Sequence, residues 1–390
     1  MAWTEKIGKN SWRVRYMKKD GRIGSVAGFR GAREARNYAD DLEADKRRGR
    51  RYDPDDAKTT VTKWAAVWID TIDVDIRTET NYRSILRNHI LPRWGTESLG
   101  DILASDTNKW LKGLRDNGYA YPTVGTIRSV FSMLLDDAVD ERLIDSSPVQ
   151  HKRRRGRRCP KHAMPRERIW GTPSQVLRIA NQAALLGGPN ARLLIITAGW
   201  TGARWGELTG LHRSNVRLTN RGGSITIDPD TGSLHEGNNT LWLGPPKTPA
   251  SVRTISLPPF LATLLREHLC STINDFVFTT PNGHWIHRSN FDRRILRPAV
   301  DGNLTKHNAA VQTRPIQPGL TFHGLRHSHK TWLIADNIPE IAQARRLGHH
   351  LDNRIIETYS HVAPEVEQRL LRALERRWRN THPTTHLHAA

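Results

Sequence analysis

Thr201-Gly202-Ala203-Arg204-Trp205-Gly206-Glu207-Leu208 is the stretch of this 390-residue sequence from which its fold can be predicted. Two shorter segments follow it: His323-Gly324-Leu325-Arg326-His327, and Leu347-Gly348-His349 with Tyr359-Ser360-His361 ten residues further on. Each segment is weak evidence alone, because a pattern such as His-x-x-Arg often arises by chance. Together and in this order, they bring guanidinium, imidazole and phenol groups into the C-terminal half of the chain.

At these segments the chain resembles the tyrosine recombinases, the family of the phage-type integrases. That family has an Arg in a Thr-Gly-x-Arg-x-x-Glu segment, then a His-x-x-Arg, a Leu-Gly-His and a Tyr near the end, with a Lys on a strand hairpin between the first two. Pro246-Lys247-Thr248, followed by Arg253-Thr254-Ile255, matches the hairpin. The resemblance also extends upstream through His89-Ile90-Leu91-Pro92 to the N-terminal strands. His350 is a departure, because the family has a small residue there, and either His349 or His350 can fill the role of the Leu-Gly-His histidine.

The resemblance implies a catalytic set of six residues: Arg204, Lys247, His323, Arg326, His349 and Tyr359. A phosphodiester carries one negative charge and gains a second in its pentacoordinate transition state, which the forked donors of Arg204 and Arg326 can clamp. Tyr359 is then the nucleophile, since a phenol can both attack and leave, and Lys247 is the general acid for the 5′-hydroxyl. His323 is expected to act as a general base or phosphate ligand, and His349 to donate to a phosphate oxygen.

Other residues near these motifs have simpler interpretations. Ser360 is the main alternative nucleophile, but a serine ester suits a metal-free arginine site poorly. Glu207 is expected to be structural, either holding Arg204 or capping a helix. Further histidines suggest a metal site: His327, His329, His350 and His361. Since no pair of them has the spacing of a known metal motif, neither a metal nor a cofactor is expected.

The composition points to a polyanionic partner. The chain has 60 Lys and Arg against 39 Asp and Glu, a formal net charge of +21. The basic residues are spread along the chain rather than along one amphipathic helix, which favours nucleic acid over a membrane surface. The longest nearly apolar stretch, 193–200, is too short to span a bilayer. Glu5 and Lys6 interrupt any signal-peptide core, and Cys159 and Cys270 fit no disulfide or zinc pattern, so a cytoplasmic protein is expected.

The chain is expected to be multidomain. We predict a small β-sheet with one helix at the N-terminus, an all-α core-binding domain, and a mixed α/β, mainly α, catalytic domain of the tyrosine-recombinase type. The predicted boundaries are 1–56 for an arm-type DNA-binding module, 57–150 for the helical core-binding domain, 151–166 for a basic linker, 167–380 for the catalytic domain and 381–390 for a flexible tail.

The N-terminal residues 11–30 are predicted to form a hairpin around the turn signal Asp20-Gly21. Alternation along its first strand gives an apolar face of Trp12, Val14 and Tyr16 and a basic face of Arg13 and Arg15. The basic face is expected to contact DNA. The linker supplies further candidate DNA contacts: Arg153, Arg154, Arg155, Arg157 and Arg158.

Capping and turn signals predict the remaining elements. Thr60 is expected to cap a first helix of the core-binding domain, Pro92 and Gly95 to end a second, and Pro122 to open a fourth. In the catalytic domain, helices are predicted at 174–186, 190–200, 259–269, 289–299, 325–336, 338–347 and 365–379. Strands are predicted at 224–227, 240–243, 253–257 and 276–278, with surface loops at 228–239 and 301–319.

These expectations describe an integrase, a site-specific recombinase that cuts and rejoins DNA through a 3′-phosphotyrosyl intermediate and so integrates or excises a mobile element. The resemblance implies a homotetramer on core-type and arm-type sites of double-stranded DNA that exchanges strands through a Holliday junction. An excisionase and a DNA-bending host protein are further candidate partners. Two alternatives stay open: a type IB topoisomerase, which nicks and reseals one duplex, and a non-enzymatic, sequence-specific DNA-binding regulator.

Overall fold

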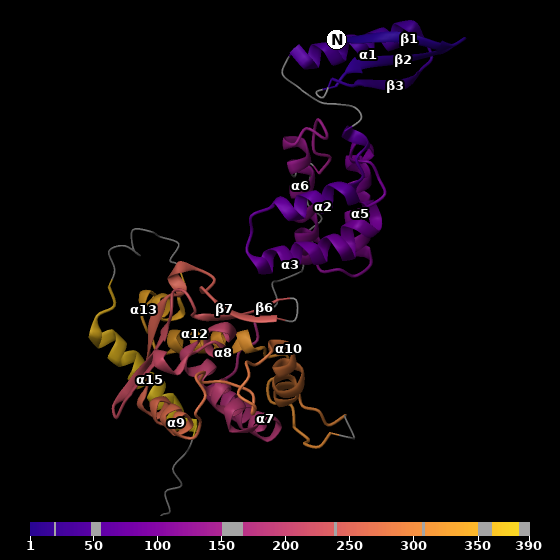
Figure 1. Cartoon of the computed structure of the whole chain (residues 1–390). Helices are drawn as coiled ribbons and strands as arrows, with labels where there is room; N and C mark the ends of the chain where they lie inside the picture. The colour runs from indigo at the N-terminus through magenta and orange to yellow at the C-terminus, as the bar shows by residue number, and fades with distance from the viewer. Residues whose placement is uncertain are drawn as a thin grey trace, which may run out of the picture. The chain divides into compact units, whose positions relative to one another are not determined.

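The computed structural model describes residues 1–18, 21–47, 56–149, 167–237, 240–305, 309–349 and 361–381 (Figure 1). The chain divides into two compact units, Met1–Lys161 and His162–Ala390. The five arginines predicted in the basic linker lie outside the described residues: Arg153, Arg154, Arg155, Arg157 and Arg158. Among the described residues, no helix combines the length and the apolar character needed to cross a lipid bilayer.

A three-stranded antiparallel sheet opens the first unit, in the order β1 (Ala2–Gly8), β2 (Ser11–Met17), β3 (Ile23–Phe29). The predicted hairpin is confirmed as β2 and β3, while β1 was not predicted, because its short apolar positions are interrupted by charged residues. Helix α1 (Ala32–Arg47) follows. Val14 is fully buried and packs with Ala35 and Ala39 of α1, so the apolar side of β2 faces the helix.

The opposite face of this sheet carries an ion-pair cluster. Arg13 and Arg15 project there together with Glu5, which lies opposite Arg13 in the register of β1 and β2. The Nε atoms of Arg13 and Arg15 lie 2.7 and 2.8 Å from the same Glu5 Oε2. The hydrogen bond from Arg13, and the charges of both arginines, lower the pKa of Glu5 below its usual value. The predicted basic face therefore has a carboxylate at its centre.

The described part of the first unit that follows is mainly helical, with α2 (Val61–Thr71), α3 (Ile76–Ile85), α4 (Leu91–Trp94), α5 (Ala104–Asp116) and α6 (Tyr121–Asp140). Thr60 caps α2 as predicted, its side chain accepting a hydrogen bond from the Lys63 backbone N–H. The prediction that Pro92 ends the second helix was wrong. A π-helical turn, Leu86–Ile90, joins α3 to α4, and Pro92 falls in the first turn of α4, where a missing N–H costs little.

Aromatic side chains fill the core between these helices. Trp94 stacks on Phe131 of α6 with ring centroids 5.6 Å apart, and the indole of Trp64 donates to the carbonyl of Leu134 at 2.7 Å. Burying each such side chain contributes roughly 1.5–3 kcal/mol. Among the described residues, the core of this helical region draws on positions between Val61 and Val149 and on no side chain of the N-terminal sheet.

The second unit contains two small sheets surrounded by helices. Its helices are α7 (Pro173–Thr201), α8 (Trp205–Thr209), α9 (Pro259–Cys270), α10 (Arg288–Phe291), α11 (Arg297–Asp301), α12 (Phe322–Ala335), α13 (Glu340–Leu347) and α15 (Pro364–Thr381). The strands β4 (Val216–Thr219), β5 (Gly222–Ile227) and β8 (Arg253–Leu257) form one antiparallel sheet in the order β4-β5-β8, and β6 (Ser233–Gly237) pairs with β7 (Thr240–Gly244).

The predicted helices 174–186 and 190–200 are confirmed: the backbone of Gly188, with φ 78° and ψ −178°, is not helical and separates two helical segments of α7 just before Pro189. Other predictions for this unit need correction. The predicted loop 228–239 contains strand β6, which is stabilised by pairing with β7, and β4 was not predicted. The predicted strand 276–278 is absent from the described structure: Phe276 makes an isolated bridge to His212, and Val277 and Phe278 are buried in the core instead.

Helix α7 runs through the core of the second unit and ends at the candidate site. Trp200 near its end packs against Trp332 of α12 with ring centroids 5.0 Å apart. Phe260 of α9 stacks on Trp378 of α15 at 4.2 Å. The contact between Trp200 and Trp332 fixes the end of α7 against α12, and thereby brings together two of the sequence segments that carry the predicted catalytic residues.

Candidate active site

Arg204 occupies the turn between α7 and α8. It is the N-cap residue of α8, and Glu207 of the first turn accepts hydrogen bonds from its backbone N–H at 2.8 Å and from its Nη1 at 2.7 Å. The same Nη1 donates to Ser251 Oγ at 2.7 Å. Glu207 therefore both holds Arg204 and caps the helix, as the sequence predicted.

Arg326 lies on α12 and is buried, with 3% of its surface exposed. Its Nη1 donates to the carbonyl of Gly202 at 2.7 Å, and its Nη2 to the carbonyl of Leu347. Burial lowers the pKa of Arg326 to about 9, helped by the positive charge of Arg204 and opposed by the negative charge of Glu207. The guanidinium stays protonated at neutral pH despite this shift.

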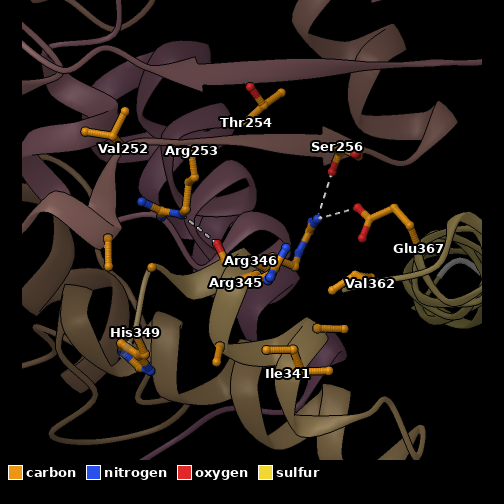
Figure 2. Close-up of a pocket in the computed structure, with 14 residues that line it drawn as sticks. Val252, Arg253, Thr254, Ser256, Ile341, Arg345, Arg346, His349, Val362 and Glu367 are labelled. Carbon is orange, nitrogen blue, oxygen red and sulfur yellow. Dashed lines mark hydrogen bonds and ion pairs between the residues drawn. The ribbon is translucent and has the colours of Figure 1, made fainter. Parts of the chain in front are cut away.

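Three arginines converge on the C-terminal end of α13. Three successive carbonyls there accept hydrogen bonds: that of Arg346 from Arg253 Nε at 2.7 Å, that of Leu347 from Arg326, and that of Gly348 from Arg204 Nη2 at 3.3 Å. Figure 2 shows the first of these bonds. The last carbonyls of a helix have no partner within it and carry partial negative charge, so they attract cations.

The cluster has an excess of positive charge. Glu207 is 1% exposed at its side chain and pairs with both Arg204 and Arg253, whose Nη2 lies 2.9 Å from Glu207 Oε2. Burial alone would raise the pKa of Glu207, but the hydrogen bonds and charges of Arg253 and Arg204 outweigh it and lower the pKa. One carboxylate thus balances three guanidinium groups, and the remaining charge calls for an anion.

Two glycines allow the turns of this site. Gly202 ends α7 with φ +66°, and Gly348 ends α13 with φ +64°, both in the left-handed region. A Cβ at Gly202 would lie 2.6 Å from Leu347 Cδ2, and one at Gly348 would lie 2.8 Å from the carbonyl oxygen of Ala250. The Gly of Thr-Gly-x-Arg and the Gly of Leu-Gly-His are therefore required by both conformation and space.

Two imidazoles lie within electrostatic reach of the arginines. His323, one turn before Arg326 on α12, and His349, directly after Gly348, are both only partly exposed. Desolvation lowers the pKa of each to about 4, and the charges of Arg326 and Arg204 add to the effect in both. Both imidazoles are therefore neutral at physiological pH in the absence of an anion.

Lys247 lies in the connection from β7 to β8, and its side chain is exposed. Four residues later, Ser251 ties this connection to the arginine cluster: its Oγ accepts from Arg204 and lies 2.8 Å from Thr248 Oγ1. Within the described ranges, no hydrogen bond or ion pair involves the Lys247 ammonium group. Among the described residues, the lysine side chain is therefore unpaired, on a segment that Ser251 anchors beside Arg204.

Residues 172–365 match the sequence model of the phage integrase family. The prophage phiRv2 integrase of Mycobacterium tuberculosis is 25% identical over 311 residues, which cover 77% of this chain and 74% of the relative. A solved structure of the Tn1549 transposon integrase in complex with a circular intermediate DNA superposes with a TM-score of 0.58 and 18% identity, covering 81% of this chain and 99% of that one. A solved structure of a lambda integrase tetramer bound to a Holliday junction superposes with a TM-score of 0.54 and 18% identity, covering 92% of this chain and 99% of that one.

The chain belongs to the phage integrase family of tyrosine recombinases. In this integrase, the structure brings together four of the six predicted catalytic residues, Arg204, Arg326, His323 and His349, with Lys247 on the neighbouring connection. Tyr359, the predicted nucleophile, lies outside the described residues, as do His350 and Ser360.

Sequence reasoning did not predict two residues of the cluster around Arg204 and Glu207. Arg253 and Ser251 contact Glu207 and Arg204, although neither was a predicted site residue. Arg253 did stand in the segment that matched the lysine hairpin, and a charged residue at the start of a short apolar strand is the signal that could have found it. In the described parts of the chain, no cluster of His, Cys, Asp or Glu could hold a metal ion.

Proposed function

We propose that this integrase cuts and rejoins DNA at specific sites through a 3′-phosphotyrosyl intermediate, and so integrates or excises a mobile element. The arginine cluster around Glu207 carries the proposal. A scissile phosphate has one charge in the ground state and two in its transition state, and the cluster offers a fixed excess of positive charge without a metal. The charge match is stronger in the transition state than in the bound substrate, which is the condition for catalysis.

Arg204 and Arg326 would bind the two non-bridging oxygens of the scissile phosphate. Arg204 makes a long hydrogen bond of 3.3 Å to the Gly348 carbonyl, and its side chain is 26% exposed. Phosphate oxygens are stronger acceptors than that carbonyl, so the guanidinium can exchange one for the other without leaving its place. Removal of one such donor costs about 10²–10³ in rate.

The neutral state of the imidazoles supports their proposed roles. A neutral His323 has a lone pair and can accept the proton of the attacking phenol, which a protonated imidazole cannot. A neutral His349 still has one N–H to donate to a phosphate oxygen. Both pKa values lie near 4 in the free protein, so both groups are in this state at neutral pH.

In the proposed cleavage step, the Oη of Tyr359 attacks the phosphorus, its proton passes to His323, and a 3′-phosphotyrosyl bond forms. The bond from phosphorus to the 5′ oxygen breaks, and Lys247 supplies the proton that makes this oxygen a hydroxyl. Attack by a 5′-hydroxyl of the partner duplex reverses each step and releases the tyrosine.

The remainder of the chain would hold the DNA. We assign residues 1–56 to arm-type sites, 57–150 and 167–380 to the core site, and 151–166 to a basic linker between them, with 381–390 as a tail. A solved lambda integrase is a tetramer on a Holliday junction, and we propose the same assembly for this chain. Arg13 and Arg15 are the proposed arm-site contacts, with the linker arginines near the core site. An excisionase and a DNA-bending host protein remain candidate partners, and the cytoplasm the expected compartment.

A covalent trap tests the proposal. The full chain would be incubated in EDTA with a nicked duplex taken from the DNA that flanks its gene, so that the released fragment cannot return. We expect a protein–DNA adduct whose peptide maps to Tyr359, attached to a 3′ phosphate. Tyr359→Phe should bind the duplex equally well and form no adduct. An adduct on Ser360, or adduct formation by the Phe variant, would overturn the mechanism, while binding without any adduct would favour a DNA-binding regulator.

A further inference from the structure

Arg253 contributes to the site in a different way from Arg204. Its side chain is 7% exposed, against 26% for Arg204. Four of its five N–H donors have partners within the protein: Nε on the carbonyl of Arg346, both Nη1 donors on Glu207 and the carbonyl of Ser251, and one Nη2 donor on Glu207. Arg253 therefore has little left to offer a phosphate.

The partners of Arg253 belong to three separate segments. Glu207 holds Arg204 at the start of α8, and Ser251 ends the short turn that follows Lys247. The carbonyl of Arg346 belongs to the last turn of α13, which is followed by Gly348 and His349, and Figure 2 shows the Arg253 side chain reaching it from β8. One guanidinium thus connects the segments that carry three of the predicted catalytic residues.

We infer that Arg253 is a positioning residue for DNA cleavage by this integrase, an inference that rests on the proposed function. It acts through Glu207, which it holds with two hydrogen bonds at 2.9 and 3.1 Å, and Glu207 in turn orients Arg204. The planar fork of arginine can make this set of bonds, whereas the single ammonium of lysine cannot. Misplacement of a catalytic group by about 1 Å can cost about 10²-fold in rate.

The test is Arg253→Lys, which keeps the positive charge but loses the fork. Arg213→Lys is the matched control, because Arg213 also donates to three carbonyls, those of Leu269, Thr272 and Asn274 at the end of α9, away from the site. Adduct formation on the nicked flanking duplex would be timed at saturating protein, with affinity measured by gel shift. We expect Arg253→Lys to cleave about 10²-fold more slowly with affinity changed less than about twofold, and Arg213→Lys to match wild type in both.

A second substrate separates positioning from general loss of structure. Replacing one non-bridging oxygen of the scissile phosphate by methyl removes the charge that Arg204 has to meet. The cleavage defect of Arg253→Lys should then shrink to less than about tenfold, since a misplaced Arg204 matters less on a neutral phosphate. If Arg253→Lys fails to fold, Glu207→Asp serves as the second variant. It shortens the carboxylate partner of Arg253 while keeping its charge, and should slow cleavage of the charged phosphate more than cleavage of the methyl-substituted one.

Three results would overturn the positioning role. Arg253→Lys could cleave at the wild-type rate, it could be slowed equally on the normal and the methyl-substituted phosphate, or Arg213→Lys could be slowed as much as Arg253→Lys. If the wild-type protein forms no adduct with either duplex, the proposed function itself fails.

Discussion

Two glutamates of this chain each pair with two arginines, and they differ in how far water reaches them. Glu5, in the N-terminal sheet, contacts Arg13 and Arg15 with 41% of its side chain exposed. Glu207, in the second unit, contacts Arg204 and Arg253 with 1% exposed. The exposed cluster is screened by solvent, so its arginines can turn to another anion at little cost. Removing one partner from the buried cluster costs far more free energy, and the buried cluster therefore holds its arginines in one place.

Removing the proposed general acid should have the largest effect, and it would separate chemistry from DNA holding. Lys247→Ala should cut the cleavage rate by about 10²–10⁴ while leaving DNA affinity nearly unchanged, because the exposed ammonium acts on the leaving oxygen. Adduct formation on the nicked duplex measures the loss. A substrate with sulfur in place of the bridging 5′ oxygen should restore the rate, since a thiolate leaves without a proton. Equal defects on both substrates would remove Lys247 from this role.

Neutralising the two glutamates compares the clusters directly. Glu207→Gln should lower the free energy of unfolding of the second unit by about 3–5 kcal/mol, because two largely buried guanidinium groups lose their counter-charge. Glu5→Gln should leave unfolding of the first unit unchanged, since solvent already screens its pairs. Urea titration of both variants provides the measurement. Equal shifts of the two midpoints would mean that burial is not what separates the clusters.

The pH dependence of stability should also differ between the two regions. His323 and His349 have folded-state pKa values of about 4, below the unfolded value of 6.5, so between these limits the unfolded state binds more protons. Stability of the second unit should be fully present above pH 6.5 and fall as the pH drops toward 4. Residues 1–60 contain no histidine. Replacing both histidines by Gln should make this slope less steep without removing it, because burial also lowers the pKa values of His327 and His329 in the same unit. An unchanged slope in the double variant would contradict the assignment.

The smallest effect is expected at the exposed cluster. Arg13→Gln should weaken binding of arm-type DNA modestly and make the plot of log affinity against log salt less steep by about 0.9, the contribution of one phosphate contact. Gel-shift titrations at several salt concentrations provide the measurement. Cleavage of the nicked core duplex should not change, because Arg13 lies in the unit that does not contain the arginine cluster. A cleavage defect would argue against the assignment of residues 1–56 as an arm-binding module.

The sequence was most informative where structure depends on neighbouring residues. Thr60 as a cap and Pro122 as an opening residue located the starts of α2 and α6 well, because those signals act within a few residues. Strand β6 was missed because pairing with β7 stabilises it more than its own composition does. Pro92 was misjudged because a π-helical turn shifted it into the first turn of the next helix.

The candidate site shows the same difference between features set by neighbouring residues and features set by distant ones. Motif spacing predicted Arg204, Arg326, His323 and His349 as site residues, and the structure places these four near one another. Arg253 was not predicted, because its partners Glu207 and Arg346 are 46 and 93 residues away in the chain. Contacts at that separation leave no periodic pattern, so only the fold could reveal them.

The glycines that end α7 and α13 also offer a rule for telling working copies of this gene from decayed ones. A copy in which Gly348 has mutated to alanine keeps every arginine, histidine and tyrosine of the proposed catalytic set. Its new methyl group would have to share space with the Ala250 carbonyl oxygen and the Ser251 Cα, 2.8 and 3.0 Å away. Such a copy retains all the predicted catalytic residues but is expected to have no recombinase activity. A genome survey of intact elements therefore has to check the two glycines as well.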